Sequence, residues 1–318
     1  MYFVAKAVFA ASSSLVLSSA AIAAPIGLAL GNNGSTLVTI ADISTASGLS
    51  GKSIRLADGS AVTLDDIDYR PATGEVFGYN DQDDTVYRVD VSTGVATAVA
   101  SRPGGTNVPT NGFDFNNVLD AARIVNTQEA NLVFRPNATP PDIIGSEAGV
   151  MPLRYNDGDA NFGRDPSIFA NAYTNAFAGP ASTRQFVLDS EWDILATLDN
   201  NAGTLNTIGS VFSDGMALDF TENGGFDILS AMMGENVGYA LLTDAGGVGL
   251  YEIALAANAM GQVDAMLLGR FDGQFGVLDG FTVFDAGDVA PVPVPAAAGL
   301  LIAGLAGLAA LGRRRRAA

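Results

Sequence analysis

Oxygen-bearing side chains recur at alternating positions in the segment 156–165, which reads Asn-Asp-Gly-Asp-Ala-Asn-Phe-Gly-Arg-Asp. The residues that this spacing offers as ligands are Asp157, Asp159, Asn161 and Asp165. Such spacing of oxygen donors is typical of calcium loops. Phe162, however, stands where such loops have a turn glycine, Ile168 replaces the bidentate glutamate, and Arg164 opposes a cation. The segment is therefore interpreted either as a calcium site or as a polar insertion without metal.

The chain contains neither cysteine nor histidine. These absences exclude a thiolate nucleophile, a His-based triad and an ordinary zinc or copper site. The expected cofactor is none, with calcium as the alternative, because a resident metal has to be hard and oxygen-ligated.

Pairs of carboxylates are the remaining route to catalysis, since two of them can hydrolyse a glycosidic bond. The acidic residues considered for such a pair are Asp65, Asp66, Asp68, Glu191 and Asp193. A structural role competes with this one: Asp68, Asp114 and Asp219 recur in similar contexts, where aspartate accepts backbone N–H bonds. Trp192, the only tryptophan, is expected to face the core, with stacking on a sugar ring as the alternative.

The charge argues against one class of partner. Lys6 and Arg313–Arg316 lie at ends without acidic residues, so the body of the chain holds 11 basic against 34 acidic residues. Nucleic acid and anionic membrane surfaces require basic patches, so such a body would be repelled by both.

Short runs rich in Val, Ile, Thr and aromatic residues alternate with Gly, Asn, Asp and Pro between residues 25 and 284, without a sustained helical period. This pattern predicts an all-β domain. The clearest expected strands are 36–41, 86–91, 184–188, 237–242, 249–255 and 265–271. The segment 80–84 is expected to be a hairpin turn.

An apolar-Asp-aromatic unit repeats at 67–69, 113–115 and 218–220, with degenerate copies at 172–173 and 280–281. The spacing suits four short strands and their turns, which is one blade of a β-propeller. We expect a small propeller of about five blades, in which residues 278–284 join N-terminal strands around 26–41 to close the ring. A β-sandwich is the alternative.

The N-terminus resembles a secretory signal. Lys6 precedes an apolar stretch, and Ala21-Ile22-Ala23 offers a small-x-small signal peptidase site, with cleavage expected after Ala23 in preference to Ala24. The expected division is therefore a signal peptide at 1–23, a β domain at 24–286, a linker with a sorting motif at 287–296, and a transmembrane helix with a basic tail at 297–318.

The C-terminus carries a three-part signal, consisting of a short motif, an apolar run at 297–312 and a basic stop. The motif is Val292, Pro293, Val294, Pro295 and Ala296, and the basic stop is Arg313, Arg314, Arg315 and Arg316. Arginines after an apolar run resist translocation. The signal resembles the VPLPA-CTERM variant of PEP-CTERM signals, which implies cleavage by an exosortase-type transpeptidase in a Gram-negative bacterium. A permanent membrane anchor is the alternative.

A broader resemblance covers most of residues 27–284. It rests on the segments 64–74, 112–116 with Asp120 and 123–125, 158–161 and 172–175. Together they resemble the secreted family called domain of unknown function 4394. Asn117 replaces the proline usual in that family, and 128–131 is irregular. The resemblance implies a propeller-like exported domain and brings no catalytic residues.

We therefore expect an exported, non-enzymatic protein at the cell surface or in the extracellular matrix, in the inner membrane only in transit. Its expected partners are signal peptidase, an exosortase-type transpeptidase and a surface glycan, since PEP-CTERM-type signals are associated with exopolysaccharide. A polysaccharide-active surface enzyme that uses carboxylates, supported by calcium, is the alternative.

Overall fold

The computed structural model describes residues 24–102 and 111–288, and these form strands and turns with two short 3₁₀ helices, η1 (Ser146–Ala148) and η2 (Asn200–Ala202). The first blade contains β1 (Pro25–Gly31), β2 (Thr36–Asp42), β3 (Ser47–Ser53) and β23 (Asp279–Asp285). The second contains β4 (Arg55–Leu56), β5 (Asp66–Arg70), β6 (Glu75–Asn80), β7 (Thr85–Asp90) and β8 (Val95–Ser101). The third contains β9 (Asn111–Asn116), β10 (Ala121–Asn126), β11 (Asn131–Arg135) and β12 (Asp142–Ile144).

The last two blades share one ten-stranded sheet. The fourth consists of β14 (Ile168–Tyr173), β15 (Gln185–Asp189), β16 (Ile194–Asp199) and β17 (Thr204–Ser213), with β13 (Arg154–Tyr155) and β18 (Met216–Ala217) beside β17. The fifth consists of β19 (Phe220–Met232), β20 (Glu235–Asp244), β21 (Gly247–Ile253) and β22 (Gln262–Arg270). Parallel pairing of the outer strands β17 and β22 joins these two blades.

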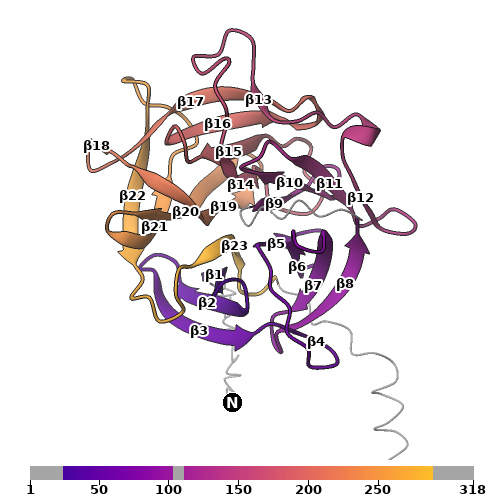
Figure 1. Cartoon of the computed structure of the whole chain (residues 1–318). Coiled ribbons are helices and arrows are strands. Elements are labelled where there is room, and N and C mark those ends of the chain that lie inside the picture. The colour runs from indigo at the N-terminus through magenta and orange to yellow at the C-terminus, as the bar shows by residue number, and fades with distance from the viewer. Residues whose placement is uncertain (1–23, 103–110, 289–318) are drawn as a thin grey trace, which may run out of the picture.

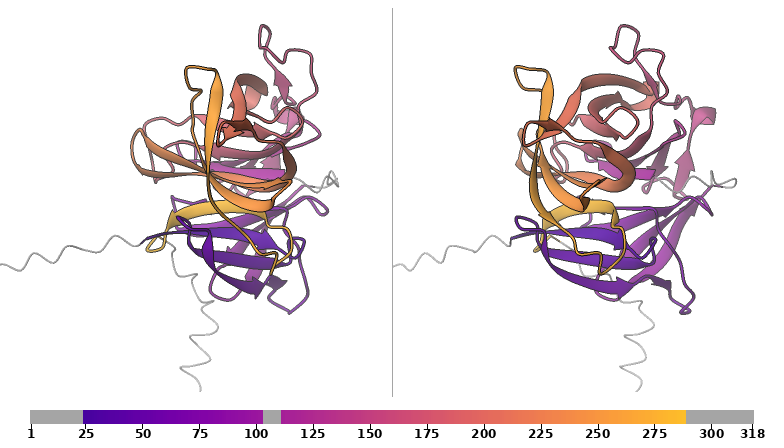
Figure 2. Two further views of the ribbon diagram at one scale, coloured as in Figure 1. Left: turned by 90° about the vertical axis from the view of Figure 1, so that its left-hand side faces the viewer. Right: turned by 60° about the vertical axis from the view of Figure 1, so that its left-hand side comes forward.

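The blades close into a ring around a central axis (Figure 1). The inner strands contact one another in the order β5, β9, β14, β19 and β23, and β23 returns to β5. The strand β23 pairs with β1, so the C-terminal strand completes the N-terminal blade. Figure 2 shows this yellow strand beside the indigo strands from two further directions. The predicted five-bladed propeller and its mode of closure are confirmed, and the sandwich alternative is wrong.

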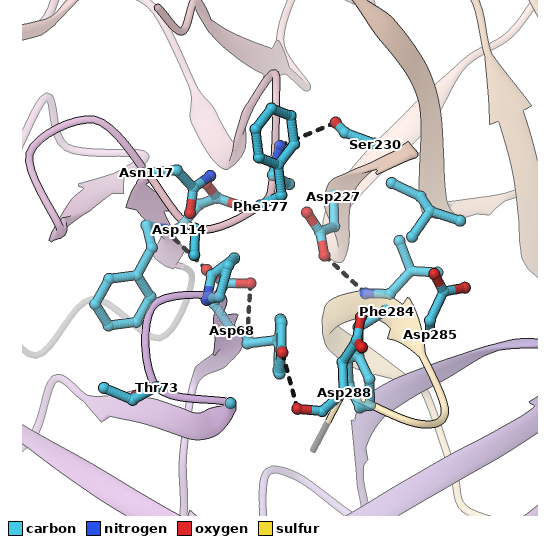
Figure 3. Close-up of a pocket in the computed structure, with 18 of the residues that line it drawn as sticks. Asp68, Thr73, Asp114, Asn117, Phe177, Asp227, Ser230, Phe284, Asp285 and Asp288 are labelled. Carbon is cyan, nitrogen blue, oxygen red and sulfur yellow. Dashed lines mark hydrogen bonds between the residues drawn. The ribbon is translucent and has the colours of Figure 1, made fainter. Parts of the chain in front are cut away.

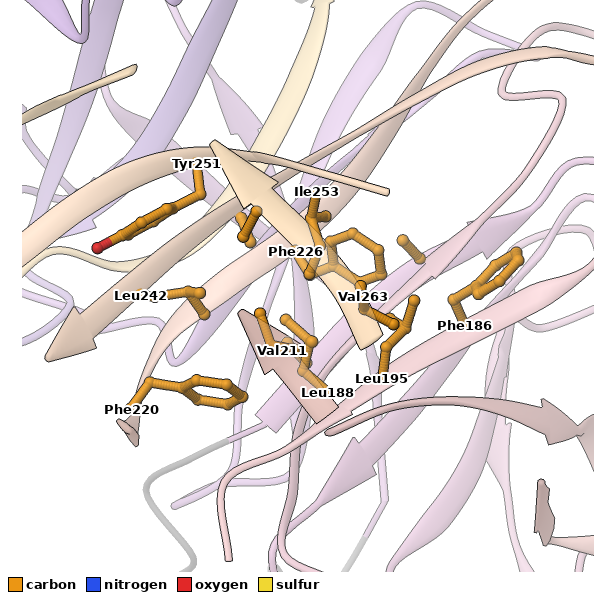
Figure 4. Packing of buried hydrophobic residues seen from close by; sticks show 14 of the residues in the cluster. Phe186, Leu188, Leu195, Val211, Phe220, Phe226, Leu242, Tyr251, Ile253 and Val263 are labelled. Carbon is orange, nitrogen blue, oxygen red and sulfur yellow. The ribbon is translucent and has the colours of Figure 1, made fainter. Parts of the chain in front are cut away.

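The core is divided among the five interfaces between blades. Each of five clusters of buried apolar residues joins two neighbouring blades, as Figure 4 shows for the fourth and fifth blades, where Phe186 and Leu195 meet Phe226 and Ile253. Because both faces of each sheet pack against neighbouring blades, the inner strands are buried at consecutive positions, and these positions include polar residues such as Asp68 and Asp114.

The turns explain why the polar sequence between strands folds as it does. The Asp90 side chain accepts N–H bonds from Ser92 and Thr93, and Gly94 then adopts a positive φ of 74°. Such an aspartate turn followed by a left-handed glycine connects two antiparallel strands. The predicted turn at 80–84 is likewise confirmed, since it lies between β6 and β7.

Among residues 24–102 and 111–288, no helix is long and apolar enough to cross a membrane. The predicted signal peptide, the sorting motif, the apolar run at 297–312 and the arginine stop lie outside the described residues.

Candidate functional site at the mouth of the propeller axis

Equivalent positions of the five inner strands meet at the axis. These positions are Asp68 on β5, Asp114 on β9, Ala172 on β14, Asp227 on β19 and Thr282 on β23, and we call them the central ring. The same hydrogen bond recurs between successive blades. The side chain at the ring position of one blade accepts a bond from a backbone N–H of the next blade, and the donor is the residue directly after that blade's own ring position.

Four of the five positions follow this rule. Asp68 accepts from Phe115 N at 2.8 Å, Asp114 from Tyr173 N at 3.1 Å, Asp227 from Val283 N at 2.7 Å and Thr282 from Tyr69 N at 3.1 Å. Ala172 has no acceptor, and Ile228 N in the following blade bonds instead to the carboxylate of its own neighbour Asp227 at 2.6 Å. These hydrogen bonds therefore connect neighbouring blades around the ring, and the series is interrupted at Ala172 in the fourth blade.

Three buried carboxyl groups come together in this ring. Asp68, Asp114 and Asp227 each contribute an oxygen, and these oxygens lie within 4.8 Å of one another. Burial raises the pKa of all three, and for Asp68 and Asp114 the neighbouring carboxyl groups raise the pKa further. None of the ion pairs among the described residues involves them. Repulsion between ionised carboxyl groups at this distance favours their protonated form. Thr282 Oγ1 lies within hydrogen-bond distance of two of them, 2.9 Å from Asp68 Oδ1 and 2.8 Å from Asp227 Oδ2.

The same three carboxyl groups are the described residues best placed to hold a metal. Hard cations such as calcium take carboxylate oxygens, so the donor chemistry fits. Several of these oxygens already accept backbone N–H bonds, which satisfies part of their capacity as ligands. The ring thus has a structural explanation that requires no ion.

A pocket of about 450 Å³ opens above the central ring (Figure 3). Its floor is formed by the three ring carboxyl groups, and its polar wall includes Asn117, Ser230, Asp285 and Asp288. The aromatic wall contains Tyr69, Phe115, Phe177 and Phe284. The rings of Tyr69 and Phe284 stack at 4.7 Å, and Tyr69 Oη donates to Asp288 O at 3.0 Å. The pocket therefore combines hydrogen-bond acceptors with apolar faces.

A second cavity of about 520 Å³ lies at the opposite end of the inner strands. Its lining includes Leu64 and Asp65, which precede β5, and Asp279, the first residue of β23. Burial raises the pKa of Asp65 to about 8 and that of Asp279 to about 7. Asp66 lies between the two cavities and bonds to Phe113 N at 2.6 Å and Phe281 N at 3.2 Å.

The structure does not assemble the predicted calcium ligands. Asp159 accepts from Thr207 N and Asn161 N, Asn161 donates to Thr207 Oγ1, and Asp157 is exposed. Asp165 faces Glu129 instead. The three aspartates are not among the acidic groups, within the described part of the chain, that are close enough to share an ion. The segment is fastened to β17 as an insertion, and calcium binding there stays a prediction without support from this geometry.

The carboxylates considered for catalysis are also separated. Asp65, Asp66 and Asp68 are distributed along the axis, whereas Asp193 bonds to Phe220 N and Glu191 lies with it in the turn between β15 and β16. The sequence therefore singled out Asp68 and, as its structural equivalent, Asp114, but not Asp227 or Thr282.

The expectation for Asp219 is wrong. Asp219 is exposed ahead of the inner part of β19, and Asp227, between Phe226 and Ile228, is the equivalent of Asp114. Trp192 packs, half-buried, against the apolar cluster between the third and fourth blades, as expected, although it lies in a turn. Its Nε1 donates to Asp165 O at 3.0 Å, and the guanidinium of Arg164 covers its ring at 4.1 Å. Its ring face is thus already occupied on that side.

The closed ring and its pocket define the class of protein, a five-bladed β-propeller. The chain belongs to the family described as Domain of unknown function (DUF4394), which matches residues 36–272. The predicted family is thereby confirmed. No curated protein matches the sequence significantly.

Among solved structures, the chain is similar to the Dos1 propeller, with a TM-score of 0.40 and 12% identity over 74% of this chain and 54% of that one. It is also similar to an auxiliary nutrient binding protein from Bacteroides thetaiotaomicron, with a TM-score of 0.39 and 11% identity over 67% of this chain and 55% of that one. A nidogen/laminin complex gives a TM-score of 0.44 and 10% identity over 81% of this chain and 98% of the other. The chain spans about half the length of the first two.

Proposed function

We propose that this protein is an exported, non-enzymatic binding protein of the cell surface that holds a glycan in the pocket above the central ring. The observation that carries the proposal is the composition of that pocket, in which carboxyl, amide and hydroxyl groups face stacked aromatic rings.

A sugar presents hydroxyl donors at its edge and C–H groups on its face. Asp285 and Asp288 are partly or fully exposed at the pocket and can accept from hydroxyl groups. Phe177 is half-buried there and offers an apolar ring face. A pocket of about 450 Å³ falls in the usual range for small ligands.

The ring carboxyl groups suit binding better than hydrolysis. Glycosidases need two carboxyl groups that are free to reach the sugar carbon or a water. Asp68, Asp114 and Asp227 are buried, and their oxygens bond to backbone N–H groups of neighbouring strands. The alternative of a polysaccharide-active enzyme gains no support from this arrangement.

Export belongs to the same proposal. Signal peptidase would remove residues 1–23, and an exosortase-type transpeptidase would cut near Pro295-Ala296, which releases Arg313–Arg316 with the apolar run. Asp288 in the pocket wall precedes Ala296 by eight residues. Eight residues span at most about 28 Å, so a C-terminal attachment would keep the pocket close to the surface that bears it.

Binding is tested with a glycan array, followed by calorimetry on the glycans found, using the wild type, Phe177→Ala and the control Phe162→Ala. Phe162 is 60% exposed on the insertion, away from the pocket. We expect Phe177→Ala to weaken binding by about tenfold, because one aromatic contact is worth roughly 1 kcal/mol or more, and Phe162→Ala to leave it unchanged. Equal affinity of the two variants, or no glycan bound by the wild type, would refute the site.

Processing is tested separately by mass spectrometry of the protein recovered from the cell surface. The expected product begins at residue 24 and lacks Arg313–Arg316. Recovery of the intact C-terminus would support a permanent anchor instead.

A further inference from the structure

The methionines of this chain occupy an unusual place. Apart from Met1, the sequence has six of them, and all six lie in the described residues. They are Met151, Met216, Met232, Met233, Met260 and Met266, with exposed fractions between 44% and 76%. Methionine is otherwise among the residue types most often buried, so a core without methionine needs an explanation.

Five of the six lie on the fifth blade or on the hairpin beside it. Met216 belongs to β18, Met232 ends β19, Met233 follows it in the turn to β20, Met260 precedes β22, and Met266 lies on β22. The buried clusters of the described blades are filled by Leu, Ile, Val, Ala, Phe and Tyr. The chain also has no cysteine, so within residues 24–102 and 111–288 every oxidisable sulfur lies at the surface.

We propose that these six methionines are surface oxidation sites at which the folded protein consumes peroxide without losing its structure. A thioether sulfur attacks one oxygen of hydrogen peroxide, so that an S–O bond forms while the O–O bond breaks. The sulfur loses two electrons and becomes a sulfoxide. The departing hydroxide takes the proton of the transferred oxygen, and the peroxide is thereby reduced to one water.

Position decides whether this reaction harms the fold. A sulfoxide is polar, and in a packed core it disrupts the structure because a buried polar group without a partner is costly. At an exposed position its oxygen is solvated. One folded chain can therefore take up six oxygen equivalents at these sites.

The test treats the purified exported protein with hydrogen peroxide and follows each methionine by peptide mapping, in buffer and in concentrated urea. We expect each of the six to oxidise in the folded protein at a rate within about threefold of its rate in the unfolded chain. The thermal midpoint of the fully oxidised protein should shift by less than about 2 °C.

The matched control is Leu195→Met, which places one thioether of similar volume at a position that is 0% exposed. We expect this introduced methionine to be protected at least about tenfold, since its oxidation requires local opening. Leu241→Met, also 0% exposed, serves if the first variant does not fold. Protection of any of the six to the same degree, or a loss of more than about 5 °C in the midpoint on oxidation, would overturn the proposal.

Discussion

Asp279 lies at the cavity opposite the proposed glycan pocket, at the start of β23, the strand that closes the ring. Its Oδ1 accepts from Gly224 N at 2.9 Å and Gly280 N at 3.1 Å. Burial is the main cause that raises its pKa from 3.8 to about 7, and the charge of Glu222 adds to it. Asp279→Asn keeps an oxygen that can accept both bonds and removes the group that ionises.

The sign follows from the raised pKa. The ionisation of Asp279 costs no stability below pH 3.8, where the carboxyl is protonated in both the folded and the unfolded chain. As the pH rises from 3.8 through the folded-state pKa of about 7, the free energy of unfolding decreases. The full shift is worth at most about 4 kcal/mol. Because the side chain is partly exposed, we take about half of that, or roughly 2 kcal/mol. Asp279→Asn should therefore be more stable than the wild type at pH 8.

The assay is the thermal midpoint of the two proteins at pH 4, 6 and 8. For a domain of this size, roughly 2 kcal/mol corresponds to about 4–8 °C, so we expect the variant to exceed the wild type by that amount at pH 8 and to approach it at pH 4. The control is Asp214→Asn, an exposed residue where the same change of charge occurs. A variant no more stable than the wild type at pH 8, or an advantage that shrinks as the pH rises, would refute the reasoning.

Two further predictions concern the contacts between blades. A Cβ at Gly112 would lie 2.4 Å from Asn171 Oδ1 and 2.8 Å from Asn171 N, so Gly112→Ala should lower the free energy of unfolding by about 1–3 kcal/mol through overpacking, and an unchanged urea midpoint would contradict this. Asp120 accepts two bonds from the buried Arg70, and Asp120→Ala should cost about 3 kcal/mol, because the guanidinium loses its counter-charge. Arg70 lowers the pKa of Asp120, so the stabilisation by this ion pair should disappear as the pH falls below 3.8. The thermal midpoints of the wild type and Asp120→Ala at neutral and acid pH measure this stabilisation. Equal midpoints at neutral pH would contradict the assignment.

The fold could be predicted because its strands and turns are determined by local sequence patterns. Each expected strand among 36–41, 86–91, 184–188, 237–242, 249–255 and 265–271 overlaps a strand of the structure. Alternation and turn residues report on the strands themselves. The repeat of apolar-Asp-aromatic units then indicated the number of blades. Since the last copy of the unit lies at the C-terminal end of the domain, residues 278–284 were expected to join the N-terminal strands and close the ring.

The site was harder to predict because it depends on register. Asp227 lies between Phe226 and Ile228, so no aromatic residue follows it, whereas Leu218-Asp219-Phe220 at the beginning of the 13-residue β19 fits the expected unit. Thr282 replaces the aspartate altogether, and its role appears only through its contacts with Asp68 and Asp227. A single sequence does not state which of two similar units reaches the axis, since long-range packing decides this.

The residues whose hydrogen bonds hold the closing strand in the ring also line the proposed binding pocket. Asp227 Oδ2 accepts from Val283 N on the closing strand, and Tyr69 Oη donates to Asp288 O just beyond it, while all four residues line the pocket. A ligand that binds only the folded chain stabilises it by about 2.7 kcal/mol at one hundred times its Kd. In this protein that stabilisation would act at the joint between the first and last strands. Occupancy of the pocket and retention of β23 in the ring should therefore rise and fall together.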